Sequence, residues 1–250
     1  IKYDLVVDLR NTLFPILLGS KIYTSPIHKA PQHILHKKDI HLWKLKALGI
    51  NTEGAKFYLN PSIEDAAYVD NFMEKTGIDG NIVVISPGSK SNIKRWSKKG
   101  FAELNDRLRD ELKVNVIMVG DSNDNSFIND ISNLSKYKII NLAGRTNLRE
   151  LVNLIKCAKL IVTNDSAPLH IASAMDTKVV AIFGPTDPKK YGPLAPGSLV
   201  IKKDLVCAPC EAPQCRYNHE CMRLITSDEV FEAALPLRRV PPLHSDNEPE

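Results

Sequence analysis

No apolar run in this 250-residue sequence is long enough to cross a bilayer. The longest runs, such as Ile82–Ile85 and Val179–Phe183, are far shorter than the roughly 20 residues of a spanning helix. A cleavable signal is also missing, because the chain opens with the charged, strand-like IKYDLVVDLR. That opening lacks a Met and resembles the middle of a domain, so we expect further residues upstream. We expect a cytoplasmic protein without a transmembrane segment.

Neither charge of one sign nor aromatic side chains are abundant. The net charge is +4 and aromatic residues make up 6% of the chain. Five basic residues fall within ten positions, but no aromatic interleaving, zinc-finger spacing or recognition-helix pattern accompanies them. A solvated helix start explains such a run, and a small phosphorylated ligand needs only one or two of its cations. Nucleic acid is therefore not an expected partner. The five residues are Lys90, Lys94, Arg95, Lys98 and Lys99.

From Asn81 onward, short apolar strands alternate with helices, as in NIVVIS, KKGFAELNDRLRDEL and VNVIMVG. This rhythm predicts a doubly wound parallel sheet with helices on both faces, an α/β fold. We place this Rossmann-like domain at residues 79–236, and the Pro-rich, polar residues 237–250 as a disordered tail.

Residues 1–78 are predicted to be part of a second Rossmann-like domain. The expected elements are strands at Tyr3–Leu9, Ile22–Thr24 and Lys56–Leu59, and helices at Thr12–Leu18, at His33–Leu48 and from Ser62, the N-cap.

Polar turns follow five of the predicted strands at their carboxyl ends. In parallel α/β sheets these ends share one edge, and ligands bind there. The sequence therefore predicts a ligand site built from PGSKSNIKRW (87–96), GDSND (120–124), LAGRTN (142–147), TNDSAPLH (163–170) and FGPTDP (183–188).

The turn TNDSAPLH has the composition of an anion-binding helix start. We expect Asn164 or Asp165 to cap the helix, leaving the amides of Ser166 and Ala167 at its mouth for a phosphate. His170 falls four residues after Ser166, on the same helix face. The plainer alternative is that Asp165 only caps the helix and His170 only packs.

The turn PGSKSNIKRW offers a hydroxyl at Ser89 and a cation for a phosphate at Lys94. Lys90 could supply that cation instead, and position alone does not choose. We expect Trp96 to be a packing residue and not a base stacker. Gly144 and Gly184 suit close approach of a ligand, although a glycine after a strand is also ordinary turn chemistry.

The blocks PGS with KRW, LAGRTNLRELVNLIKCAKLIVTNDSAPLH and FGPTDP, in this order, resemble glycosyltransferase family 9, the ADP-heptose:lipopolysaccharide heptosyltransferases and their relatives. YDLVVDLR is similar to the later part of that family's N-terminal domain. The resemblance covers roughly residues 3–230.

The resemblance implies a GT-B fold, in which two Rossmann-like domains enclose the active site. The C-terminal domain, here complete, would hold a nucleotide-activated sugar such as ADP-heptose. The N-terminal domain, here partial, would present a lipid-linked glycan such as lipopolysaccharide core, at the inner face of the cytoplasmic membrane. Ser89 and Lys94 would contact the diphosphate, and Thr146 would lie near the adenosine. Asp165, Ser166, Ala167 and His170 would hold the phosphates and the sugar.

Similar enzymes invert the anomeric centre and need no cofactor for catalysis. Their catalytic base is an Asp that precedes the segment matched by YDLVVDLR, so we expect it upstream of Ile1. Asp4 and Asp8 belong to a later strand and do not take its role. We therefore predict a donor-binding half without a complete catalytic centre.

Four of the five cysteines form the segment CAPCEAPQCRYNHEC, residues 207–221. In a cytosolic protein such a cluster binds metal more often than it forms disulfides, and the spacing suits a structural zinc better than an iron–sulfur cluster. Reduced or paired thiols are the alternative. The predicted ligands are Cys207, Cys210, Cys215 and Cys221, while Cys157 is expected to be a small core residue.

Two other functions stay open at this stage. One is a sugar-nucleotide epimerase on the same fold, against which the motif order argues. The other is a non-catalytic sugar-nucleotide-binding protein, which is compatible with the missing base.

Overall fold

The computed structural model describes residues 3–27, 29–55, 59–78 and 81–235. Their contacts form two compact units: residues 1–56 with 189–191, and residues 57–188 with the chain from Gly192 onward. The predicted tail, 237–250, lies outside the described residues, as does most of the strand expected at Lys56–Leu59. In the described part of the chain, no helix combines the length and apolarity that a membrane span requires.

The first unit contains a short parallel βαβ arrangement. Strands β1 (Leu5–Val6) and β2 (Ile22–Tyr23) pair in parallel, and α1 (Phe14–Leu17) lies between them in the sequence. The Thr24 hydroxyl accepts a hydrogen bond from the Asp8 amide at 2.7 Å and donates to the Asp8 carbonyl at 2.9 Å. Helix α2 (Lys37–Lys46) follows, and His36 caps it through Nδ1. The strands and helices predicted between residues 3 and 48 are present, but shorter than their sequence patterns.

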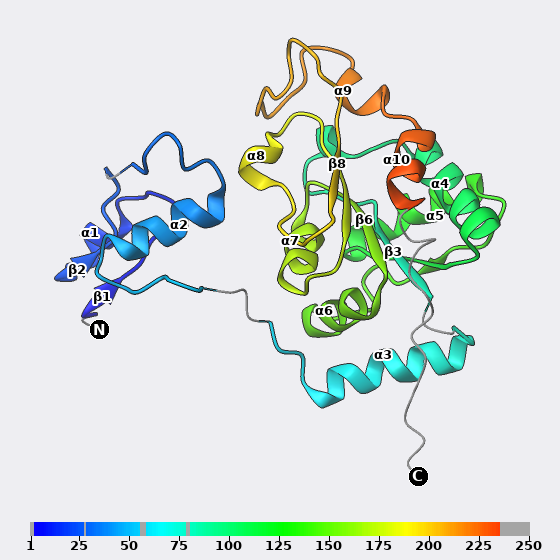
Figure 1. The fold of residues 1–250 in the computed structure, drawn as a ribbon, viewed down its shortest axis with the longest axis horizontal. Coiled ribbons are helices and arrows are strands. Elements are labelled where there is room, and N and C mark those ends of the chain that lie inside the picture. Colours follow the sequence, from blue (N-terminus) through cyan, green and yellow to red (C-terminus); the bar gives the residue numbers. More distant parts are fainter. Residues whose placement is uncertain (1–2, 28, 56–58, 79–80, 236–250) are drawn as a thin grey trace. The chain divides into compact units, whose positions relative to one another are not determined.

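The second unit is built on a six-stranded parallel sheet, which confirms the predicted fold class (Figure 1). All residues of the two central strands are buried, as expected for a sheet that is covered on both faces. The strand order is β5 (Ile140–Asn141), β4 (Asn115–Met118), β3 (Ile82–Ser86), β6 (Leu160–Asn164), β7 (Val179–Ile182) and β8 (Leu199–Ile201).

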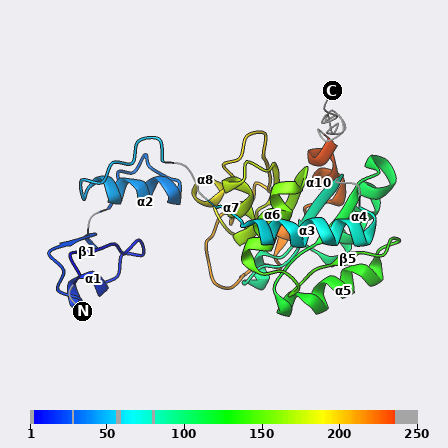
Figure 2. The same ribbon diagram turned by 90° about the horizontal axis from the view of Figure 1, so that it is seen from below.

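Helices cover both faces of this sheet. On one face α4 (Lys98–Leu112) packs against α5 (Asn125–Leu134) and α10 (Ser227–Ala234). On the other face α6 (Leu148–Cys157) packs against α7 (Ala167–Ala174) and α3 (Ile63–Thr76) (Figures 1 and 2). The described part of this unit also holds the short helices η1 (Asn92–Lys94), η2 (Ser122–Asp124) and α9 (Glu220–Arg223). Helix α8 (Pro188–Tyr191) begins in this unit, and its last three residues, 189–191, are grouped with the first unit.

Helix α3 belongs to the second unit. It packs on α6, and the Tyr68 hydroxyl donates a hydrogen bond to the Arg145 carbonyl at 2.7 Å. The compact units therefore separate near residue 56, whereas the sequence pattern placed a domain boundary after residue 78. The predicted cap of α3 is confirmed, because Ser62 and Asp65 form a capping box.

Trp96 belongs to the core, as predicted. It is 1% exposed, and its ring meets Phe101 edge-on with centroids 4.9 Å apart. Its indole nitrogen donates to the Ile225 carbonyl at 2.9 Å, which ties the segment before α4 to the segment before α10. The ring is thus unavailable for stacking on a base.

Candidate functional site

The order of strands in the sheet reverses between β3 and β6. From β3 the chain moves outward through β4 to β5, then crosses back to β6 and continues to β7 and β8 on the opposite side. In open parallel sheets a ligand crevice forms beyond the carboxyl ends of the two strands at such a switch point. Here β3 leads into residues 87–96, and β6 leads through Asp165 and Ser166 into α7. Both places lie in segments that the sequence selected, 87–96 and 163–170.

Lys94 and Asp165 meet directly at this switch point. Lys94 ends η1 in the turn after β3, Asp165 follows β6, and Lys94 Nζ lies 2.6 Å from Asp165 Oδ2. The Asp165 side chain is 8% exposed and that of Lys94 is 28% exposed. A charged hydrogen bond therefore joins the two predicted phosphate-binding turns, with the ammonium still partly open to solvent.

Ser89 lies in the same turn and is buried. Its carbonyl accepts a hydrogen bond from Arg95 Nε at 2.9 Å, and Arg95 Nη2 lies 3.2 Å from Asp124 Oδ1. Burial and the neighbouring Asp121 carboxylate raise the pKa of Asp124, while Arg95 acts in the opposite direction. Sequence reasoning missed Arg95 and Asp124. The acid-rich turn GDSND after β4 was the signal that pointed to this edge.

Gly88 and Gly120 make room for the Asp124 carboxyl. A Cβ atom at Gly88 would lie 2.2 Å from Asp124 Oδ2, and one at Gly120 would lie 2.7 Å from Asp124 Cβ. Both turns therefore close over a buried acid that pairs with Arg95. Glycine is needed here for close packing within the protein.

The start of α7 differs from the prediction in one respect. The N-cap residue is Ser166, not Asn164 or Asp165, and its side chain makes no capping bond. Its hydroxyl instead lies 3.0 Å from the Thr163 hydroxyl. The expected cap was wrong because Asp165 pairs with Lys94 and the Asn164 amide bonds to the turn after β3, so neither side chain serves the helix.

The first intrahelical bond of α7 runs from the Leu169 amide to the Ser166 carbonyl at 3.1 Å. Pro168 has no amide hydrogen, so the amides of Ser166 and Ala167 come before the hydrogen-bonded part of the helix. Ala167 and His170 are exposed and Ser166 is half-buried. Ser166 and Ala167 directly follow Asp165 in the sequence, at the carboxyl end of β6.

Thr146 is not part of this group. It is half-buried in the turn after β5, two strands away from β3, and it precedes Asn147, the N-cap of α6. The two glycines that suited a close ligand approach face protein atoms instead. A Cβ at Gly184 would lie 2.4 Å from Met222 Sδ, and one at Gly144 would lie 3.0 Å from Ser122 Cα.

Most of the basic cluster at 90–99 is paired with acids. In addition to the Lys94 and Arg95 pairs, Lys98 Nζ lies 2.5 Å from Asp130 and Lys99 Nζ lies 3.6 Å from Glu103. Lys90 is exposed. Neighbouring carboxylates therefore offset the charges of Lys94, Arg95, Lys98 and Lys99.

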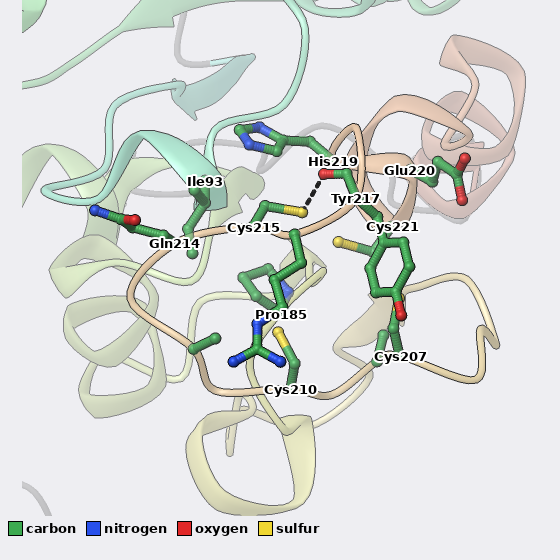
Figure 3. A pocket seen from close by; sticks show the side chains of 13 residues that line it. Ile93, Pro185, Cys207, Cys210, Gln214, Cys215, Tyr217, His219, Glu220 and Cys221 are labelled. Atoms are coloured by element: carbon green, nitrogen blue, oxygen red, sulfur yellow. Dashed lines mark hydrogen bonds between the residues drawn. The ribbon is translucent and has the colours of Figure 1, made fainter.

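The four clustered cysteines line a single pocket of about 370 Å³ (Figure 3). Cys221 is buried, and burial together with the other three thiols, Cys215 first, raises the pKa of the Cys221 thiol. The Cys215 thiol donates to the Tyr217 carbonyl, and the His219 ring points away from Cys215 and Cys221 (Figure 3).

Within the described residues, no three His, Cys, Asp or Glu side chains are gathered closely enough to hold a metal ion. As they lie, the thiols share a pocket but do not form a ligand set. The structural metal predicted from the sequence stays a prediction.

A model of glycosyltransferase family 9 (heptosyltransferase) matches residues 17–220. Lipopolysaccharide heptosyltransferase 3 of Escherichia coli (strain K12) is 32% identical over 212 residues, covering 74% of this chain and 60% of that protein. Lipopolysaccharide heptosyltransferase 2 of the same strain is 37% identical over 121 residues, covering 46% and 34%. The chain spans about half the length of other relatives that it matches.

Two solved structures share the fold. A family 9 glycosyl transferase from Veillonella parvula DSM 2008 superposes with a TM-score of 0.78 at 22% identity, covering 95% of this chain and 74% of that one. The ADP-heptose lipopolysaccharide heptosyltransferase II of E. coli gives a TM-score of 0.72 at 23% identity, covering 94% and 76%.

Proposed function

The chain belongs to glycosyltransferase family 9, and from this we propose that it holds a nucleotide-activated sugar at the switch point of its six-stranded sheet and serves the transfer of that sugar to a glycan. The observation that carries the proposal is the contact between Lys94 and Asp165, which joins the turns after β3 and β6. The relatives are described as lipopolysaccharide heptosyltransferases, which favours a heptose as the sugar and a lipopolysaccharide core as acceptor. One of the similar solved structures is described as an ADP-heptose heptosyltransferase, which favours ADP-heptose as donor.

The donor's diphosphate is expected to lie between Lys94 and the start of α7. Its negative charge would be offset by the Lys94 ammonium and by the amides of Ser166 and Ala167, at the positive end of the helix dipole. Because these groups are held before the reaction, they would also stabilise the charge that builds on the leaving diphosphate. Ser89 and His170 would contact the diphosphate and the sugar, and Thr146 the adenosine.

The acceptor hydroxyl must lose a proton during transfer, which calls for a carboxylate base. Asp8 is poorly suited to this role. Its carboxylate accepts hydrogen bonds from the Thr12 hydroxyl and from the Arg10 and Thr12 amides, and these lower its pKa to about 2. The resemblance to the family implies a different Asp as the base. A lipid-linked acceptor would bring the protein to the inner face of the cytoplasmic membrane.

Calorimetric titration of the chain with ADP tests donor binding, and an assay for ADP release from ADP-heptose in the presence of lipopolysaccharide core tests transfer by the protein. ADP binding with acceptor-dependent release supports a transferase. In a protein that includes the expected base, binding without release towards any glycan acceptor supports the alternative, a non-catalytic sugar-nucleotide-binding protein. If the chain binds neither ADP nor another nucleoside diphosphate, the proposal is wrong.

A further inference from the structure

Asn164, the last residue of β6, holds both ends of the turn that carries Lys94. Its side-chain oxygen accepts a hydrogen bond from the Trp96 amide at 3.2 Å, and its side-chain nitrogen donates to the Pro87 carbonyl at 2.8 Å. Pro87 directly follows β3, and Trp96 directly precedes the N-cap of α4. A single side chain therefore ties residues 87–96 into a closed loop and fastens that loop to the neighbouring strand.

This role requires an amide. Asn164 is fully buried, and it uses a donor and an acceptor at the same time. A carboxylate can only accept, and an aliphatic side chain can do neither. A buried Trp96 amide or Pro87 carbonyl that loses its partner is costly, because no water is at hand to replace it.

The two hydrogen bonds of the Asn164 side chain form a clamp, and this clamp determines where Lys94 lies. Asp165 follows Asn164 in the chain, and Lys94 lies inside the loop that Asn164 closes. The amide thus fixes the two partners of the ion pair from one point. Arg95 adds a second restraint within the loop through the Ser89 carbonyl.

We propose that Asn164 is a positioning residue of the donor site: it holds the 87–96 loop so that Lys94 faces the start of α7 before a nucleoside diphosphate arrives. The inference rests on the proposed function, because it assigns Asn164 to the same site. Asn164 is itself inaccessible, so it acts through Lys94 and does not touch the ligand. A cation that is already in place binds a diphosphate without the entropy cost of ordering the loop.

The test compares two alanine variants of the full 250-residue chain by calorimetric titration with ADP. Asn164→Ala should raise the dissociation constant for ADP about tenfold, because the free energy of roughly one hydrogen bond no longer holds the loop in its binding position. Asn105→Ala is the matched control. Asn105 is also fully buried, and its amide donates to Ser135 at 2.7 Å, in the segment after α5 where the sheet's strands begin. That variant should lose stability but keep its affinity for ADP.

A double variant separates positioning from a general structural effect. If Asn164 acts through Lys94, then Lys94→Ala combined with Asn164→Ala should bind ADP no more weakly than Lys94→Ala alone. A further tenfold loss in the double variant would overturn the inference, as would an unchanged affinity in Asn164→Ala.

A measurement on the wild-type chain covers the case in which Asn164→Ala does not fold. Hydrogen exchange at the Trp96 amide without ligand should be slowed at least about a thousandfold relative to an unprotected peptide, because the loop is held closed. Exchange at the unprotected rate would show that the clamp is open and would refute the inference. If the wild type binds no nucleoside diphosphate, the proposed function fails and takes this inference with it. If the wild type binds ADP and Asn164→Ala binds equally well, only the inference fails.

Discussion

Lys94 Nζ lies 2.6 Å from Asp165 Oδ2, and this contact links the turns that follow the two central strands of the sheet. Lys94→Ala should therefore weaken ADP binding about 10- to 100-fold, the range expected for a lost charged hydrogen bond. Asp165→Ala should also weaken it, because the ammonium loses the partner that orients it. Calorimetric titration measures both. Lys90→Ala is the control, since Lys90 is a nearby exposed lysine, and it should bind like the wild type. Unchanged affinity in both site variants would remove the site assignment.

Trp96→Ala should lower the free energy of unfolding by about 3–5 kcal/mol, as for other large buried aromatics. Trp96 fills the core beside Phe101 and bonds to Ile225, so the loss is one of packing. Urea denaturation gives the magnitude. Trp96→Phe should keep most of the packing and should bind ADP with wild-type affinity. A large loss of ADP affinity in a well-folded Trp96→Phe protein would point to a direct contact with the ligand.

The folding stability of the Asp124→Asn variant should rise relative to that of the wild type as the pH rises. Burial raises the pKa of Asp124 above its ordinary value of 3.8. The folded chain therefore holds this proton to a higher pH than the unfolded chain does. The stability that Asp124 contributes is complete below 3.8 and is lost as the pH rises through the raised pKa. Melting temperatures of both proteins between pH 4 and 7 test the sign. If the difference in melting temperature stays constant, or changes in favour of the wild type as the pH rises, the prediction is contradicted.

A shortened chain that begins at residue 57 should melt close to the full chain, whereas one that begins at residue 79 should be less stable. Helix α3 packs on α6 and buries Val69 to 1% exposure. Removal of one such side chain from the interface is worth about 2 kcal/mol. Thermal melts of the two shortened chains measure the difference. Equal melting temperatures would show that α3 contributes nothing to the second unit.

The sequence prediction of a structural metal has a direct test. Chain purified without added metal should carry close to one zinc, and Cys207→Ala should lose it while Cys157→Ala keeps it. Thiolates are preferred ligands of zinc, and the four cysteines line one pocket, which would have to draw together around the ion. Elemental analysis decides. Clearly substoichiometric zinc and iron would leave reduced or paired thiols as the state of the cluster.

Much of the fold follows from local patterns. The strands from Asn81 to Asn164 are short apolar runs, and all five polar turns fall at the carboxyl edge as expected. The cap at Ser62 was predictable because a capping box is local. The roles of Asn164 and Asp124 were not, since their partners are distant in sequence. Asn164 bonds to residues 68 and 77 positions away, and no propensity or spacing rule reports such a pairing.

The reversal of strand order has a consequence for how the protein acquires its binding competence. Strands β3 and β6 are neighbours in the sheet, yet Lys94 and Asp165 are 71 residues apart in the chain. The pair closes a loop that contains β4 and β5, and such distant pairings are slow to form. Nucleotide binding would thus report that the two halves of the sheet have come together. A ligand that binds only the finished arrangement would in turn stabilise all of it.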